Sequence, residues 1–97
     1  AKDEVKDLAR LRLAAVLLDE KAYDEALKQL ESTHAAAFDA RFLELKGDVL
    51  AAEGKLPEAR TAYKSALDKS ETTTAAKGGG AGRELLRQKL DSLGEAA

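Results

Sequence analysis

The chain has no cysteine, methionine or tryptophan, a single proline, and only two tyrosines and two phenylalanines among its 97 residues. Without cysteine, neither a disulfide framework nor a thiolate metal site can form. β-Branched residues are scarce outside the threonines at 72–74, which disfavours β-sheet. Alanine, leucine, glutamate, lysine and arginine dominate instead, and these residue types favour helix. We therefore predict an all-α domain.

The sequence also lacks an excess of basic charge and a long apolar run. Its formal net charge is −2, with acidic and basic residues interspersed. This pattern argues against binding nucleic acid or an anionic membrane surface, because both need a basic stripe. No apolar run approaches the roughly 18 residues of a membrane span, so we expect no direct membrane contact from this part of the chain. No signal peptide is visible. Because the chain opens with Ala1 rather than methionine, we expect a piece of a longer protein.

Apolar residues recur at helical spacing in five segments, and the length suits one domain over residues 1–97. The predicted helices cover about residues 3–20, 23–32, 36–53, 57–69 and 83–93. The first and third carry two apolar faces each, as expected of helices packed between neighbours. We predict a flexible connection over residues 71–82, which hold four glycines, and a capping helix over 83–93 that ends at Gly94.

The sequence repeats with a spacing of 33 residues, the distance from Ala14 to Gly47. Equivalent pairs include Leu17 and Leu50, Ala26 and Ala59, and Leu30 and Tyr63. Each unit consists of a long helix, a turn of about three residues and a shorter helix. We place repeat one at about residues 7–39 and repeat two at about 40–73.

Small residues recur inside these helices, although Gly47 destabilises a helix by roughly 0.5–1 kcal/mol relative to alanine. Our explanation is close packing: Gly47 and Ala59 lie where the helices of the second hairpin cross, and Ala66 lies against the following helix. Larger neighbours then fill the surrounding space, since burying a leucine-sized side chain yields about 1.5–3 kcal/mol. The predicted packing residues are Ala14, Ala26, Gly47, Ala59, Tyr63 and Ala66.

This arrangement resembles the tetratricopeptide repeat, whose usual period is about 34 residues. The resemblance rests on Gly47, Gly54, Ala59, Tyr63 and Ala66 in the second unit and on Ala14, Tyr23, Ala26 and Leu30 in the first. The chain departs from the pattern at two places. Arg10 and Leu43 stand where an early aromatic residue is usual, and the closing proline is absent near Ala40 and Glu71. The alternative is an unrelated helical bundle with coincidental spacing.

The order of several segments is similar to the carboxy-terminal part of the YfgM family of bacteria, over about residues 3–93. These segments are LRLA at 11–14, ALKQL at 26–30, LKGDVLAAEGK at 45–55 and ARTAY at 59–63, before a final amphipathic helix. The resemblance implies an ancillary subunit of the Sec translocon, with a membrane anchor and a periplasmic helical-repeat domain that links exported proteins to periplasmic chaperones. The chain would then be the periplasmic domain of an inner-membrane-anchored protein, with the anchor outside it. The open alternative is a cytoplasmic tetratricopeptide adaptor or a structural assembly module.

No sequence motif indicates catalysis, a metal or a cofactor. The glycine-rich stretch at 77–84 lacks the Lys-Ser/Thr pair of a phosphate-binding loop and has no strand before it. His34, the only histidine, has no histidine or cysteine partner and is expected in a turn. The carboxylates flank turns and helix ends, where solvation explains them. We therefore expect no enzyme and no cofactor.

The long helices of stacked hairpins line a concave face that commonly binds peptides or partner domains. We predict a groove for protein partners there, apolar at one end and charged at the other, formed by Leu11, Ala15, Leu18, Arg41, Glu44 and Asp48. Two alternatives stay open: the first three residues are covered by upstream sequence, and the last three are a solvated face. The second apolar face of the first helix also predicts self-association.

Overall fold

The computed structural model describes residues 2–31, 38–74 and 80–96, and these residues form five α-helices. The helices are α1 (Lys2–Asp19), α2 (Tyr23–Leu30), α3 (Asp39–Ala52), α4 (Leu56–Thr74) and α5 (Gly80–Ala96). The described ranges contain no β-strand. The predicted all-α class is therefore confirmed.

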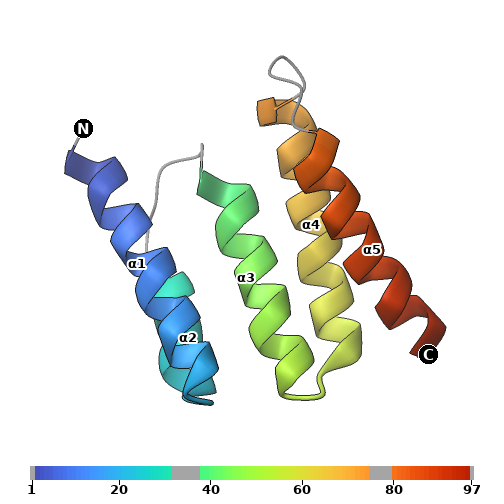
Figure 1. Cartoon of the computed structure of the whole chain (residues 1–97), viewed down its shortest axis with the longest axis horizontal. Coiled ribbons are helices and arrows are strands. Elements are labelled where there is room, and N and C mark those ends of the chain that lie inside the picture. Colours follow the sequence, from blue (N-terminus) through green and yellow to red (C-terminus); the bar gives the residue numbers. More distant parts are fainter. Residues whose placement is uncertain (1, 32–37, 75–79, 97) are drawn as a thin grey trace.

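The helices form two stacked hairpins and a closing helix (Figure 1). Helices α1 and α2 pair in the first hairpin, and α3 and α4 pair in the second through the most extensive contact in the molecule. Helix α3 touches both helices of the first hairpin, whereas α5 packs on α4. The result is a slab with extents of 41 × 33 × 17 Å, and its thin dimension corresponds to about two layers of helices.

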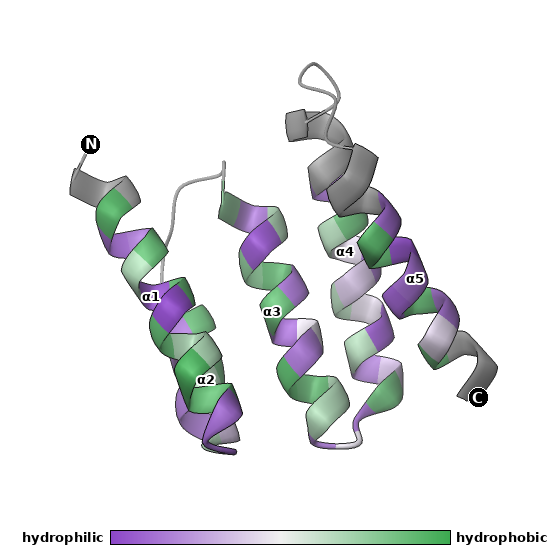
Figure 2. Ribbon diagram, in the orientation of Figure 1, coloured by the Kyte–Doolittle hydropathy of each residue, from purple (hydrophilic) through white to green (hydrophobic). Residues whose placement is uncertain are grey.

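Two apolar clusters hold the stack together. The first joins α1, α2 and α3 and consists of Leu11, Ala14, Ala26, Leu30, Phe42 and Val49. The second joins α3, α4 and α5 and consists of Leu50, Ala59, Ala62, Tyr63, Ala66, Leu86 and Leu93. Figure 2 shows hydrophobic and hydrophilic residues interleaved along the helices, as amphipathic packing requires. Helix α3 contributes to both clusters, which explains its two apolar faces.

Both hairpin turns have the same backbone geometry. Lys21 and Gly54 adopt positive φ angles of 62° and 81°. The amide of each donates to the carbonyl three residues earlier, and the next amide donates to the carbonyl five residues earlier, at 2.8–3.0 Å. This is the Schellman pattern that satisfies the last carbonyls of a helix. Because Lys21 and Gly54 are equivalent positions of the repeat, the turn repeats together with the helices.

The last two helices are longer than predicted. Helix α4 continues to Thr74, past the expected end at residue 69, and α5 begins at Gly80 and passes through Gly94 to Ala96. Much of the predicted 71–82 connection is therefore helical, because extending an existing helix needs no new nucleus and each added residue gains a hydrogen bond. Residues 75–79 and His34 lie outside the described residues, so the predicted flexibility and the turn position of His34 stay predictions.

Candidate partner-binding face

The centre of the second hairpin is a contact between Gly47 of α3 and Tyr63 of α4. Both residues are buried. A Cβ atom built on Gly47 would lie 2.5 Å from Cε1 and 2.6 Å from Cδ1 of Tyr63, which is far inside van der Waals contact. The tyrosine ring thus occupies the space that an alanine methyl group would need. The approach of this ring requires a glycine at position 47. Ala59 and Ala66 are themselves fully buried.

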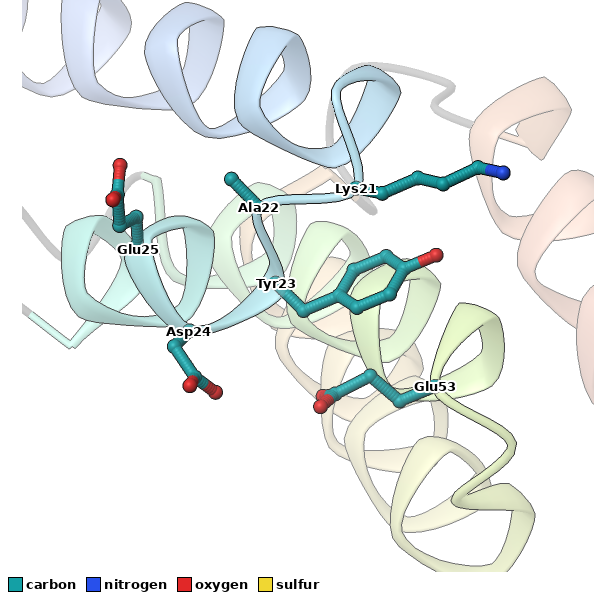
Figure 3. Close-up of a pocket in the computed structure, with 6 residues that line it drawn as sticks. All are labelled: Lys21, Ala22, Tyr23, Asp24, Glu25 and Glu53. Carbon is teal, nitrogen blue, oxygen red and sulfur yellow. The ribbon is translucent and has the colours of Figure 1, made fainter.

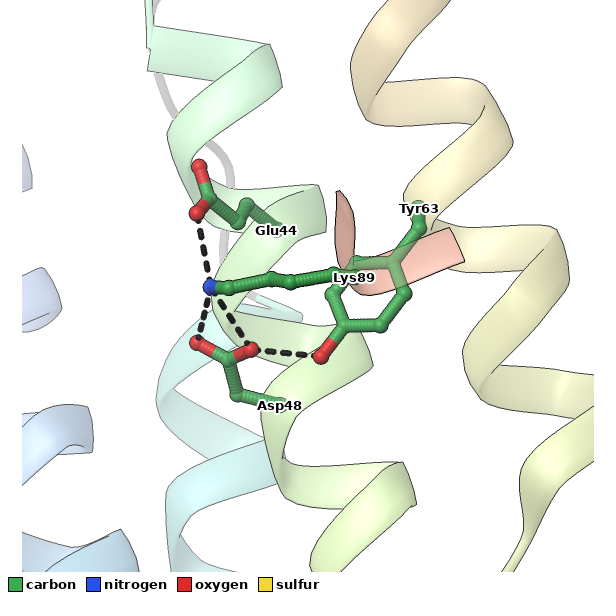
Figure 4. Close-up of polar contacts among 4 residues, drawn as sticks. All are labelled: Glu44, Asp48, Tyr63 and Lys89. Atoms are coloured by element: carbon green, nitrogen blue, oxygen red, sulfur yellow. Dashed lines mark hydrogen bonds and ion pairs between the residues drawn. The ribbon is translucent and has the colours of Figure 1, made fainter. Parts of the chain in front are cut away.

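The hydroxyl of Tyr63 connects this contact to a polar network on the surface (Figure 4). Tyr63 Oη donates a hydrogen bond of 2.5 Å to Asp48 Oδ1. Lys89 Nζ, which comes from α5, donates to Glu44 Oε2 at 2.8 Å and to Asp48 Oδ1 at 3.0 Å. It also lies 5.7 Å from the centroid of the Tyr63 ring. Glu44 and Asp48 are one helical turn apart, so α3 presents both carboxylates on the same face.

The network shifts the pKa values of two of its members. Burial raises the pKa of Tyr63 far above its ordinary value, and the hydrogen bond to Asp48 and the negative charges of Asp48 and Glu44 add to the effect. Burial alone would lower the pKa of Lys89, but the hydrogen bonds to Glu44 and Asp48 outweigh it and the pKa is raised. The folded protein therefore holds Tyr63 neutral as a proton donor and Lys89 charged.

The predicted groove residues separate into a charged group and an apolar group. Glu44 and Asp48 converge in the network, whereas the nearby Arg41 is exposed, with its guanidinium 5.8 Å from the centroid of the Phe38 ring. On α1, Ala15 is exposed and Leu18 is half-buried.

Leu11 does not line an open face, because it is only 9% exposed and belongs to the cluster between the hairpins. Its assignment to the groove is therefore wrong. Sequence analysis also missed Lys89, which lies outside the two repeats. Two cations, Arg87 and Lys89, lie between Leu86 and Leu90, and nothing in the sequence distinguished Lys89 as the one that reaches α3.

A pocket of about 360 Å³ adjoins the network. It is lined by Ala51, Tyr63, Leu85, Gln88, Lys89, Ser92 and Leu93. Leu85 is 49% exposed, whereas the adjacent Leu86 is buried in the cluster between the helices. Because Tyr63 and Lys89 line the pocket and also contact Asp48, the pocket and the acidic pair form one continuous surface between α3 and α5.

Two other hollows lie elsewhere on the stack. One of about 450 Å³ lies between α2, α3 and α4, over Leu27, Leu43 and Leu50. The second, of about 370 Å³, lies at the start of α2 (Figure 3).

At the second hollow, the ring of Tyr23 lies beside the side chain of Glu53, whereas Asp24 and Glu25 point in different directions (Figure 3). Lys55 Nζ is 3.8 Å from Glu53 Oε2. In the described part of the chain, no group of three or more His, Asp or Glu side chains is arranged to hold a metal ion.

Comparison with known proteins agrees with the repeat geometry. A family model described as a tetratricopeptide repeat-like domain matches residues 1–95. The chain belongs to the tetratricopeptide repeat-like family. No solved structure matches it.

A curated relative in Neisseria gonorrhoeae (strain ATCC 700825 / FA 1090), named ancillary SecYEG translocon subunit, is 44% identical over 89 residues. The alignment covers 92% of this chain and 40% of the relative, so the chain spans less than half of the relative's length. The relative's name confirms the resemblance to a family of ancillary translocon subunits. Among the described residues, no helix has the length and apolar character to span a bilayer.

Proposed function

We propose that this chain is a non-catalytic protein-interaction module of an ancillary subunit of the Sec translocon. The observation that carries the proposal is the 44% identity to a protein of that name along 92% of this chain. The fold supports it, because stacked helical hairpins offer extended surfaces to protein partners.

The chemistry of the described surface also supports a binding role. Tyr63 is held neutral by burial, and Lys89 is held charged by two carboxylates, so neither is prepared to accept a proton near neutral pH. The exposed features are suited to contact instead. Three exposed large apolar residues, Val5, Leu13 and Val16, lie on α1, and the acidic pair and its pocket lie between α3 and α5.

The finer placement follows from the family resemblance. We place the chain in the periplasm as part of an inner-membrane-anchored protein, where it links exported proteins to periplasmic chaperones. The proposed partner face comprises Ala15, Leu18, Arg41, Glu44 and Asp48, which are exposed or half-buried on α1 and α3. A cytoplasmic adaptor or an assembly module is the alternative that the sequence leaves open.

Co-purification with the translocon tests the proposal. The natural protein that contains this chain is tagged, its host membranes are solubilised in mild detergent, and recovered SecY is quantified. We expect SecY to co-purify with the natural protein and to be lost when residues 1–97 are deleted. Equal recovery after the deletion, or no recovery at all, would overturn the assignment. Protease treatment of spheroplasts separates the two locations, since a periplasmic domain is digested without cell lysis and a cytoplasmic adaptor is protected.

A further inference from the structure

The pocket between α3 and α5 has a definite chemical character. Its apolar wall comes from Ala51, Leu85 and Leu93, and Leu85 is half exposed although it borders a hollow of about 360 Å³. An apolar side chain entering the pocket would bury surface on both sides of the contact, at about 25 cal/mol per Å² of apolar surface removed from water. The pocket is therefore suited to one apolar side chain of a partner.

The acidic pair beside the pocket carries more negative charge than its one bound cation neutralises. Glu44 and Asp48 supply two carboxylates, whereas Lys89 is the one cation that contacts both of them in the described part of the chain. The three side chains are each about a quarter exposed, so they remain in contact with solvent. The Tyr63 ring beside the ammonium adds a further favourable contact for a cation. Charge complementarity therefore selects a basic partner.

Lys89 lies between the pocket and the acidic pair. Its side chain extends from α5 past the Tyr63 ring to the carboxylates (Figure 4), and it also lines the pocket. A lysine side chain has a flexible four-carbon stem, so Lys89 can move into solvent while Leu86 and Leu93 keep α5 in place. With Lys89 displaced, both carboxylates are open to a cation from a partner whose neighbouring side chain enters the pocket.

We propose that this site binds an extended protein segment in which a lysine or arginine neighbours a large apolar residue. The basic side chain takes the place of Lys89 on Glu44 and Asp48, and the apolar side chain enters the pocket beside Leu85. An arginine can bind the two carboxylates through several of its N–H groups at once. This inference rests on the proposed interaction function and names the chemistry of the partner segment.

Peptide binding to the 97-residue chain tests the proposal. The probes are fluorescently labelled peptides of sequence GSKLSG and GSELSG, and binding is followed by fluorescence anisotropy at about 0.15 M salt, where the Debye length is about 8 Å. We expect the lysine peptide to bind and the glutamate peptide not to bind. In Lys89→Met the lysine peptide should bind roughly five- to tenfold more tightly, because both carboxylates are left without their cation.

A matched variant separates this site from general charge effects. Lys64→Met makes the same change in net charge at an exposed position of α4. It should alter the affinity by less than about twofold, because distant surface charges are screened. Glu44→Gln with Asp48→Asn should abolish binding of the lysine peptide. Melting curves monitored by circular dichroism establish that each variant is folded, and Lys89→Gln replaces Lys89→Met if the latter unfolds.

Two results would overturn the proposal: equal affinity gains in Lys89→Met and Lys64→Met, or equal binding of both peptides. These results are distinguishable from failure of the proposed function. A protein that co-purifies with SecY but shows no peptide preference keeps its translocon role and loses this site.

Discussion

The two hairpins share one backbone plan and differ where their helices meet. The first hairpin has Ala14 and Leu30 at the positions that hold Gly47 and Tyr63 in the second. Both pairs are buried. In the second hairpin, glycine stands in place of the alanine and tyrosine in place of the leucine. The tyrosine ring fills the space that the alanine methyl group would occupy. The comparison teaches that the glycine is not a general feature of the repeat but a specific partner of the tyrosine.

The two hairpins also differ in the polar groups that their long helices present beside these buried pairs. Leu11 and Ala15 of α1 are equivalent to Glu44 and Asp48 of α3. The first pair offers no polar group to a neighbouring helix, whereas the second accepts hydrogen bonds from Tyr63 and Lys89. The tyrosine thus has two roles that a leucine cannot combine: its ring packs on Gly47, and its hydroxyl reaches the polar network.

Restoring a methyl group at Gly47 should have the largest effect on stability. In Gly47→Ala, the new Cβ atom overlaps the Tyr63 ring, which must move and weaken its bond to Asp48. We expect a loss of about 1–3 kcal/mol in the free energy of unfolding, typical of overpacking, and more for Gly47→Leu. Urea unfolding monitored by circular dichroism measures the change. An unchanged midpoint would contradict the steric role of the ring.

A double variant sharpens this test. Gly47→Ala with Tyr63→Leu recreates in the second hairpin the pair found in the first. We expect the double variant to be less destabilised than the sum of the two single variants, because the leucine leaves room for the methyl group. Additive losses would show that the two residues do not compete for the same space.

Alkaline pH should destabilise the second hairpin through the same tyrosine. The pKa values of Tyr63 and Lys89 are raised in the folded state, so the folded protein holds their protons more tightly than the unfolded chain does. Their contribution to stability is complete below about pH 10, near the ordinary pKa values of both groups. It is lost as pH rises above 10, by up to about 1.4 kcal/mol per pH unit for each proton released on unfolding.

Replacing each tyrosine in turn shows which phenol causes the loss of stability at alkaline pH. Tyr63→Phe keeps the ring on Gly47 and removes the phenol, so the loss of stability between pH 10 and 11.5 should become shallower. Tyr23→Phe, which removes the other phenol of the chain, is the matched control and should leave the pH dependence as in the parent protein. Urea midpoints measured across this pH range provide the comparison. Equal slopes for the parent and Tyr63→Phe would contradict the role of Tyr63.

The outer face of the first hairpin differs from the equivalent face of the second. Val5, Ala9 and Val16 of α1 are equivalent to Phe38, which immediately precedes α3, and to Phe42 and Val49 of α3. Phe38, Phe42 and Val49 pack in the cluster with the first hairpin, whereas Val5 and Val16 are 68% and 52% exposed.

We expect this uncovered face to cause weak self-association of the 97-residue chain, because apolar patches on surfaces favour contact. Sedimentation equilibrium should show an apparent mass that rises with concentration, and Val16→Glu should remove the increase. A constant monomer mass at millimolar concentration would contradict this expectation.

Sequence periodicity was sufficient to predict the helices and their pairing, because apolar spacing and small residues are local signals. The contact between Gly47 and the Tyr63 ring could not be predicted, since the repeat spacing aligns equivalent positions and does not show which side chain crosses to the next helix. The position of Leu11 was misjudged for a related reason. Only packing against α3 distinguishes a buried apolar position from an exposed one. Lys89 could not be placed, because its partners lie two helices away and no repeat position corresponds to it.

The turns provide the smallest difference between the hairpins. Lys21 and Gly54 occupy the same left-handed position, which costs an ordinary L-residue roughly 1–2 kcal/mol and a glycine almost nothing. Lys21→Gly should therefore stabilise the protein by about 0.5–1 kcal/mol, after allowing for the greater freedom of glycine in the unfolded chain. Gly54→Lys, the reverse change in the second hairpin, should destabilise it by a similar amount. If urea unfolding showed both substitutions to be neutral, the left-handed conformation would not favour glycine over lysine at either turn, and the expected difference between the two turns would be contradicted.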